Sequence, residues 1–290
     1  MPTAHARPSI RPLLAAPSGA TVPVCLDALG ARLIEQHGFP AAYLSGGALG
    51  FALAVSEALL TTTEVAGRTR EITQRCGIPL IVDGGVGFGD AVHAWRALAE
   101  IEAAGGAAVE LEDQVAPKRA HHHRGHEHLV PLAEMAGKLA EAAGARRDPE
   151  FAIIARTGAV RHEGMDAAIA RARAYVAAGA DAIMLTPRDE PELRRAAAEI
   201  PAPLVLMAMA GRWPAALLAE CRVPLVIDPF SGQVVMYRAL RDMLAHVRDL
   251  GTPGGDGDEL MTLYREMQAV AGMEALYAIE RRTTEQDAEE

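Results

Sequence analysis

Two acidic residues stand at the ends of neighbouring apolar runs. Asp83 closes the run Pro79–Asp83, and Glu112 directly follows the run Ala107–Leu111. If these runs are adjacent parallel strands, their carboxyl ends meet at one edge and the two carboxylates face the same point. Oxygen ligands of this kind hold hard cations such as Mg²⁺, with water completing the coordination shell. A Mg²⁺ site is therefore expected here, with two separate salt bridges as the alternative.

The segment after Glu112 is cationic and rich in histidine. It contains Lys118 and then His121, His122 and His123 in succession. Imidazole titrates near neutral pH, which suits general acid or base catalysis. Zinc sites need ligands held on rigid elements, so a run of three histidines does not by itself indicate one. We expect a loop that folds over the carboxylates, although histidines that only face solvent would give the same pattern.

Groups suited to an anionic substrate follow two other apolar runs. Arg156 comes directly after Phe151–Ala155, and its guanidinium matches the geometry of a carboxylate or a phosphate. An arginine in this position is costly to place unless something pairs with it, which favours substrate binding. The run Ala41–Ser45 ends in hydroxyls and unhindered backbone N–H groups. Its candidate substrate-binding residues are Tyr43, Ser45, Gly46 and Gly47.

These residues belong to a repeating pattern of elements. Eight short apolar runs have the composition of buried strands, and segments with helical spacing lie between them. This alternation predicts a parallel sheet covered by helices, and eight units predict a closed (β/α)₈ TIM-type barrel. The runs are Val22–Leu26, Ala41–Ser45, Pro79–Asp83, Ala107–Leu111, Phe151–Ala155, Ala182–Leu185, Leu204–Met207 and Pro224–Ile227. The helices are expected at Leu29–His37, Thr62–Cys76, Asp90–Ala104, Pro131–Ala145, Met165–Ala178, Pro191–Ile200, Pro214–Cys221 and Gly232–Leu250.

The chain divides into three parts. Residues 1–20 are rich in proline and form an N-terminal arm, residues 21–250 form the barrel, and residues 251–290 hold a linker, extra helices and a polar tail. The linker contains glycine, proline and aspartate, which interrupt regular structure. The extra helices are expected at Glu259–Gln268 and Met273–Ile279. Their apolar faces need a partner, which on general grounds is the same barrel.

Composition limits the classes of function. The formal net charge is −10, which argues against a nucleic-acid partner. No run approaches the roughly 18 apolar residues of a membrane span, and the N-terminus lacks the apolar core of a signal peptide. The three cysteines are widely spaced, which favours free thiols in a reducing compartment. A cytoplasmic protein is therefore expected.

The order of the motifs resembles that of the isocitrate lyase and phosphoenolpyruvate mutase superfamily, most closely its methylisocitrate lyase-like members. Tyr43–Gly47 is similar to the family's Ser-Gly-Gly segment, and Asp83–Gly89 resembles its Asp-x-Asp-x-Gly-Phe/Tyr-Gly loop. Glu112–Gln114 and Pro117–Arg119 resemble its Glu-Asp-Gln and its Lys-Lys/Arg-Cys-Gly-His gate. Arg156-Thr157 resembles its Arg-Thr-Asp.

The resemblance covers about residues 20 to 280 and implies an assembly and a chemistry. Family members are barrels whose eighth helix reaches into a neighbouring subunit, usually in a tetramer, so the C-terminal helices are expected to be swapped between subunits. Their reactions make or break a bond next to a 2-oxo acid enolate, which Mg²⁺ and backbone N–H groups stabilise. The resemblance therefore implies a small carboxylic-acid substrate. In the lyases a base removes a hydroxyl proton, the carbon–carbon bond cleaves, and the gate cysteine protonates the carbanion.

The sequence departs from the family pattern at four places. Gly85 replaces the second carboxylate of the Asp-x-Asp loop, Ala120 replaces the gate cysteine, and Gly158 replaces the aspartate after Arg-Thr. The acidic residue expected after the second strand is matched only loosely, by Glu57, which becomes a third candidate metal ligand. Because Ala120 cannot donate a proton, a lyase of this sequence needs another donor.

Three functions are compatible with these departures. The first is a carbon–carbon lyase acting on a small 2-hydroxy di- or tricarboxylic acid, in which Lys118 contacts substrate and a histidine replaces the cysteine. The candidate histidines are His121, His122 and His123. The second is a decarboxylase or hydrolase of a 2-oxo diacid, and the third is a catalytically inactive binding relative. The substrate side-chain pocket is expected to involve Phe51, Trp213 and Met207–Gly211.

Overall fold

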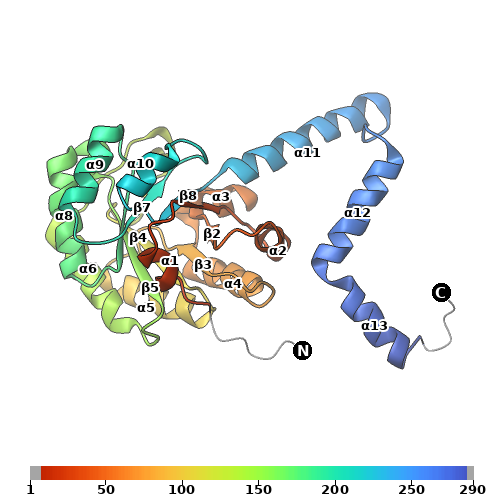
Figure 1. Ribbon diagram of the computed structural model, residues 1–290, viewed down its shortest axis with the longest axis horizontal. Helices are drawn as coiled ribbons and strands as arrows, with labels where there is room; N and C mark the ends of the chain where they lie inside the picture. Colours follow the sequence, from red (N-terminus) through yellow and green to blue (C-terminus); the bar gives the residue numbers. More distant parts are fainter. Residues whose placement is uncertain (1–7, 286–290) are drawn as a thin grey trace.

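The centre of the molecule is a ring of eight parallel strands (Figure 1). The computed structural model describes residues 8–285. Hydrogen-bonded neighbours follow the order β1, β8, β7, β6, β5, β4, β3, β2, and a parallel bridge from Val24 to Tyr43 links the two remaining edges. The strands are β1 (Ala20–Pro23), β2 (Ala42–Leu44), β3 (Leu80–Asp83), β4 (Ala108–Glu112), β5 (Ala152–Arg156), β6 (Ala182–Leu185), β7 (Leu204–Met207) and β8 (Leu225–Asp228). The predicted (β/α)₈ barrel is confirmed.

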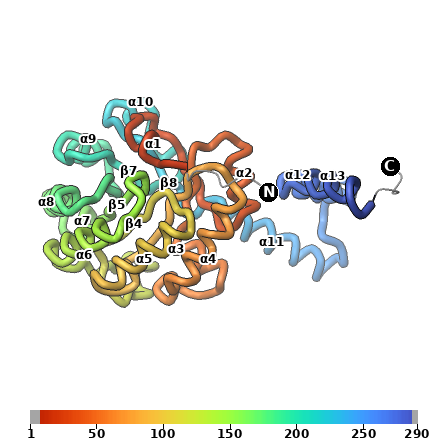
Figure 2. The backbone as a smooth tube through the Cα atoms, turned by 90° about the horizontal axis from the view of Figure 1, so that it is seen from below, coloured from red at the N-terminus to blue at the C-terminus, as the bar shows by residue number. Residues whose placement is uncertain are grey.

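Helices surround this ring and connect its strands (Figure 2). The expected elements are present with ends shifted by a few residues, whereas α3, α7 and two 3₁₀ turns are too short for the apolar pattern to predict. The helices of the barrel region are α1 (Arg11–Ala15), α2 (Ala28–Gln36), α3 (Gly46–Ala52), α4 (Thr62–Thr73), α5 (Ala91–Ala103), α6 (Leu132–Ala145), α7 (Ala159–His162), α8 (Met165–Ala177), α9 (Glu190–Glu199) and α10 (Ala215–Glu220). The 3₁₀ turns are η1 (Glu57–Leu59) and η2 (Ala120–Arg124).

The described part of the N-terminal arm closes one end of the barrel. Ile10 and Leu14 are buried and pack with Ala107, Ala152 and Leu225, which lie at or near the starts of their strands. This end is opposite the carboxyl ends of the strands, so the arm seals the barrel away from the predicted site. Residues 1–7 of the expected arm and residues 286–290 of the expected polar tail lie outside the described residues.

After β8 the chain leaves the barrel. α11 (Ser231–Leu250) extends away from the ring (Figures 1 and 2). α12 (Gly257–Ala271) and α13 (Met273–Thr283) follow it outside the barrel, and α12 contacts α2. α11 contains no buried residue, so it does not cover the barrel as the other predicted helices do. No helix within residues 8–285 is long and apolar enough to cross a membrane.

A buried lysine ties the outer helices to the glycine-rich loop after β3. Lys138 on α6 is 2% exposed, and its Nζ donates to the carbonyl oxygens of Val86 (2.8 Å) and Gly89 (2.9 Å). A buried ammonium is tolerated only where hydrogen bonds compensate for lost water, and desolvation lowers the pKa of Lys138. The loop that follows Asp83 is therefore held from behind by α6.

Replacing Lys138 with methionine should lower the free energy of unfolding by about 1–3 kcal/mol, because two largely buried carbonyls lose their donor while side-chain length is kept. Denaturant unfolding followed by circular dichroism measures the change. Glu141→Gln, on an exposed position of the same helix, is the matched control and should stay within about 0.5 kcal/mol of the unchanged protein. Equal stability of Lys138→Met would contradict this role.

Candidate active site

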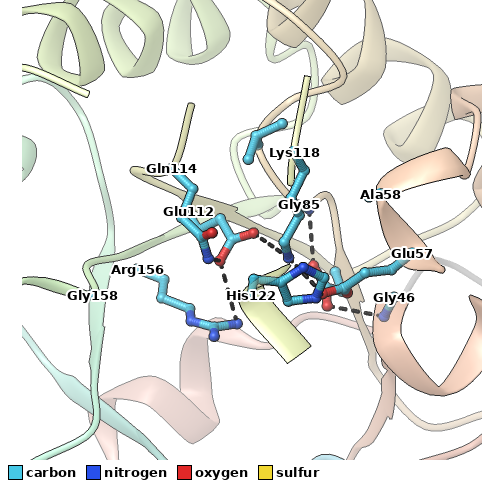
Figure 3. A network of polar contacts seen from close by, with 12 residues as sticks. Gly46, Glu57, Ala58, Gly85, Glu112, Gln114, Lys118, His122, Arg156 and Gly158 are labelled. Carbon is cyan, nitrogen blue, oxygen red and sulfur yellow. Dashed lines mark hydrogen bonds and ion pairs between the residues drawn. The ribbon is translucent and has the colours of Figure 1, made fainter. Parts of the chain in front are cut away.

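Four carboxylates gather at or just inside the carboxyl ends of the strands, and Figure 3 shows two of them, Glu57 and Glu112. Asp83 ends β3, Glu110 and Glu112 belong to β4, and Glu57 comes from η1. Glu110 and Glu112 are two residues apart, so their side chains project from the same face of the strand. Asp83, Glu110 and Glu112 are all buried. The predicted convergence of Asp83 and Glu112 is observed, and it includes Glu57, which the sequence matched only loosely.

Two cations are inserted among these carboxylates. Lys118 Nζ lies 2.6 Å from Glu57 Oε1 and also pairs with Glu112 Oε1, which places the ammonium between the two acids (Figure 3). Arg156 Nη1 lies 3.1 Å from Glu110 Oε1 and 3.8 Å from Glu112 Oε2. The guanidinium therefore neutralises the cluster from β5, while Lys118 does so from the loop after β4.

The remaining charge is unevenly compensated. Burial raises the pKa of Glu110 to about 7, with repulsion from Asp83 adding to the effect. Burial also raises the pKa of Asp83, as does the negative charge of Glu57. Burial opposes ionisation of Glu112 too, but Lys118 and Arg156 hold its pKa below the ordinary value. Glu110 and Asp83 thus have less compensation for their ionised forms than Glu112.

His122 is the histidine that the loop delivers to this cluster. Its Nε2 pairs with Glu57 Oε1, and its Nδ1 lies 2.6 Å from the carbonyl oxygen of Arg119. Both ring nitrogens thus face acceptors, which suits the doubly protonated imidazolium. Burial favours the neutral ring, but the hydrogen bond and charge of Glu57 together with the hydrogen bond to Arg119 outweigh it, so the pKa of His122 is raised.

The two neighbouring histidines lie elsewhere. His121 is exposed. The ring of His123 stacks on Phe51 with centroids 5.1 Å apart, and its Nε2 lies 3.1 Å from Ser56 Oγ. Ala120, at the position of the gate cysteine in the family, is exposed. Of the three candidate histidines, the structure therefore brings only His122 to the carboxylates.

The Ser-Gly-Gly segment supports Asp83 directly. Ser45 caps α3 by accepting from Ala48 N (3.3 Å), and Gly46 N donates to Asp83 Oδ2 (2.9 Å). A Cβ on Gly46 would lie 3.0 Å from both Asp83 Oδ2 and Glu57 Oε2, so the close approach of these acids favours glycine. Gly47 borders the larger of the two cavities described below.

Tyr43 lies deeper than the sequence analysis placed it. It is fully buried in the barrel interior, and its hydroxyl donates to Glu110 Oε2. Tyr43 and Ser45 are two residues apart and share a strand face, but Tyr43 is one level further into the barrel. Its hydroxyl therefore supports Glu110 in this structure instead of facing the rim.

Two cavities flank the charged cluster, and Glu57 borders both. A cavity of about 310 Å³ is lined by Gly46, Asp83, Gly85 and Lys118, among others. A larger cavity of about 510 Å³ is lined on one side by Ser45, Gly47, His122 and Arg156. Of the residues expected to shape the substrate side-chain pocket, Phe51 and Met207 line this larger cavity. Trp213 is buried beneath the guanidinium of Arg212.

The departure at Gly158 has a local explanation. A Cβ at this position would collide with Glu127 Oε2, so a loop carboxylate fills the space beside the glycine. Glu127 also pairs with His162 at 3.2 Å and lines the larger cavity. Neither Glu127 nor Glu110 was among the predicted site residues. No local pattern marks Glu127, whereas the two-residue spacing to Glu112 could have indicated Glu110.

The donor chemistry of the cluster fits Mg²⁺. Asp83, Glu112 and Glu57 supply the hard oxygen ligands that this ion prefers, and burial together with the neighbouring negative charges raises the pKa of Asp83. Within residues 8–285, however, no three or more aspartate, glutamate, histidine or cysteine side chains are grouped closely enough to hold a metal ion. Lys118 instead lies between two of the three expected ligands.

Comparisons with known proteins agree with the motifs. The chain is 40% identical over 256 residues to probable 2-methylisocitrate lyase 1 of Corynebacterium glutamicum, covering 86% of this chain and 84% of that protein. It is 35% identical over 278 residues to 2,3-dimethylmalate lyase of Eubacterium barkeri, with coverages of 93% and 96%. A phosphonopyruvate hydrolase solved with oxalate and Mg²⁺ superposes with a TM-score of 0.80 at 30% identity, covering 93% and 97%. The model of the phosphoenolpyruvate phosphomutase family matches residues 10–248. The resemblance seen in the motifs is thereby confirmed, and the chain belongs to the phosphoenolpyruvate phosphomutase family.

Proposed function

We propose that the protein is a carbon–carbon lyase that cleaves a small 2-hydroxy di- or tricarboxylic acid and releases a 2-oxo acid. The observation that carries the proposal is the joint docking of Lys118 and His122 on Glu57, at the rim that holds Asp83 and Glu112. This arrangement supports His122 as the proton donor in place of the family cysteine. The two lyases compared above support the same reaction class.

Substrate binding is assigned to the rim of the larger cavity. Ser45, Gly47 and Arg156 line it together, and the Arg156 side chain is 20% exposed. The backbone N–H groups and the guanidinium suit the carboxylate next to the hydroxyl carbon. Asp83 and Glu112, with Glu57 as a third candidate, would hold Mg²⁺, which when bound supplies positive charge to stabilise an enolate oxygen.

Proton transfer is assigned to the loop. A carboxylate of the cluster accepts the hydroxyl proton, and the electron pair of the O–H bond forms the C=O bond of the 2-oxo acid. The bond from the hydroxyl carbon to its neighbour breaks, and its electron pair stays on that neighbour. The imidazolium of His122 then gives this carbanion a proton, a step that Ala120 cannot perform. Lys118 is also assigned to the substrate carboxylates, and its ammonium pairs with Glu57 and Glu112 at the rim, beside the smaller cavity.

A second candidate is hydrolysis or decarboxylation of a 2-oxo diacid. The observation that favours it is the missing cysteine, together with 30% identity to a phosphonopyruvate hydrolase. Both candidates are tested by product analysis of a panel of 2-hydroxy and 2-oxo diacids, each with Mg²⁺ or with EDTA. A 2-oxo acid plus a second acid supports the lyase, whereas carbon dioxide alone supports decarboxylation. Absence of turnover with every acid contradicts both and favours an inactive binding relative.

We also propose a homo-oligomer, a tetramer in the family pattern, in which α11–α13 pack on a neighbouring subunit. Support comes from the exposed apolar stripe of α11, formed by Tyr237, Leu240, Leu244 and Val247 at helical spacing. Because this stripe is not covered by its own barrel, it faces water in the isolated chain.

A cytoplasmic location is part of the proposal. Cys25, Cys76 and Cys221 are all free thiols, and Cys25 and Cys221 are buried. Free buried thiols are typical of proteins in a reducing compartment.

Replacing His122 with glutamine should lower kcat by about 10²–10⁴-fold, because the general acid is lost while the side chain can still hydrogen bond. Steady-state 2-oxo acid release measures the effect. The matched control is His121→Gln in the same turn, which should change kcat by less than about threefold since its side chain faces solvent. Similar losses in both variants would mean that His122 is not the proton donor.

Replacing Gly85 with aspartate should tighten Mg²⁺ binding by about tenfold, because another carboxylate joins the ligand set. A Cβ on Gly85 meets no atom within 4 Å, so there is room for the side chain. The φ of +52° is in the left-handed region, which aspartate and asparagine tolerate best among residues with a Cβ. Titration calorimetry with MgCl₂ measures the affinity, and Gly85→Asn is the uncharged control. Equal affinities of the two variants would contradict a ligand role at this position.

The double variant Leu240→Lys and Leu244→Lys should reduce the molecular mass in solution towards that of one chain, because two ammonium groups would enter the apolar interface. Light scattering after gel filtration measures the mass. Arg241→Gln, outside the apolar stripe, is the control and should keep the assembly. A tetramer of the double variant, or a monomer of the unchanged protein, contradicts the proposed exchange of helices.

A further inference from the structure

The mouth of the barrel is chemically divided. The ends of β3, β4 and β5 carry Asp83, Glu112 and Arg156. The ends of β6 and β7 present Thr186 and Met207 to the larger cavity, and neither carries a charge. The charged half of the rim can therefore bind the polar head of a substrate, whereas the half formed by the ends of β6 and β7 is uncharged.

The charged residue at the end of β8 does not alter this division. Asp228 is 5% exposed, and its carboxylate accepts hydrogen bonds from the backbone N–H groups of Ala210 (2.9 Å) and Ser231 (3.0 Å). These bonds, one from the loop after β7 and one from the start of α11, satisfy the carboxylate. Asp228 thus fixes the turn into α11 and does not line either of the two cavities beside the charged cluster.

Four apolar side chains line the uncharged half of the larger cavity, and we call them the apolar wall: Phe51, Met207, Phe230 and Val234. Phe51, Phe230 and Val234 are 60%, 44% and 56% exposed, although all three border the same cavity. Gln233 Nε2 donates to the carbonyl oxygen of Ala48 at 2.7 Å, which fixes the first turn of α11 against α3. The parts of the wall on α3 and α11 are therefore held together, and β7 contributes Met207.

The cavity offers little to a further carboxylate at this wall. The guanidinium of Arg156 is assigned to the acid head of the substrate, on the charged half of the rim. His123 stacks on Phe51 of the wall, but desolvation lowers its pKa and favours the neutral ring. Arg161 also lines the cavity, but it belongs to α7, after β5, on the polar side with Glu127. A carboxylate against the apolar wall would lose water without gaining a partner, whereas a hydrocarbon group there would remove apolar surface from water.

We propose that the substrate carries a short hydrocarbon substituent on the carbon next to the hydroxyl carbon, and that this substituent packs on the apolar wall. A third carboxylate in that position is disfavoured. This inference rests on the proposed function, which places the acid head of the substrate at Ser45 and Arg156. It narrows the substrate class from di- or tricarboxylic acids to alkyl-substituted 2-hydroxy diacids.

The test compares two 2-methylmalates that carry either an n-propyl or a carboxymethyl group on carbon 3, which are similar in size and differ in charge. The value of kcat/KM for 2-oxo acid release should be at least about tenfold higher for the propyl compound. Equal or higher kcat/KM for the carboxymethyl compound overturns the inference.

A binding measurement separates this inference from the proposed reaction. Calorimetry with propylsuccinate and with tricarballylate, the matching tricarboxylate, needs no turnover, and propylsuccinate should bind more tightly. Val234→Arg should shift the ratio of the two affinities by about tenfold towards tricarballylate, because it adds a cation to the wall. Val235→Arg is the matched control, since its neighbouring site on α11 is 54% exposed and outside the cavity lining.

The outcomes are distinct. If no diacid is cleaved but propylsuccinate binds more tightly in a manner that Val234→Arg reverses, the lyase proposal fails and the apolar subsite stands. If tricarballylate binds to the unchanged protein as tightly as propylsuccinate, the apolar subsite fails, whether or not any acid is cleaved.

Discussion

Burial of three carboxylates, Asp83, Glu110 and Glu112, beside the partly buried Glu57 is the constraint on which the site depends. A carboxylate taken out of water is destabilised by several kcal/mol unless charges and hydrogen bonds compensate. Arg156 compensates from β5, and Lys118 compensates from the loop after β4. Because Lys118 belongs to that loop, its pairing with the carboxylates both neutralises the cluster and docks the loop. The position of His122, four residues further on, follows from the same pairing.

The departures from the family pattern are connected through this cluster. The loop that lacks a cysteine at Ala120 brings an imidazole to Glu57 two residues later. The glycine at 158 leaves space that the Glu127 carboxylate occupies. Gly85 removes a negative charge from a cluster in which Asp83 is already insufficiently compensated. Each change alters which residue contributes a side-chain group at the rim. Most of the replacing groups come from the loop that carries residues 118–127.

The barrel was predictable because apolar strands and amphipathic helices alternate with distinct periods, and that alternation is local information. The convergence of Asp83, Glu112 and Arg156 was also predictable, since all three end strands of one parallel sheet. The depth of Tyr43 was not predictable from the sequence, because two positions on one strand face differ only in their height within the barrel. Nor was the choice of His122 among three histidines, which depends on the 3₁₀ turn η2 and on the contact with Glu57, more than sixty residues away in sequence.

The division of the rim links the topology to specificity. Every charged group of the cluster comes from η1 or from β3, β4, β5 and the loop after β4, whereas the apolar wall comes from α3, β7 and the β8–α11 segment. A substitution in the wall therefore changes which substituent fits without disturbing the ion pairs that fix Lys118 and His122. A substitution in the cluster instead affects Lys118 and His122, because it alters the charge balance that docks the loop. Separate elements thus allow substrate range and reaction chemistry to change independently on one barrel, which is how a single scaffold accommodates relatives with different acids.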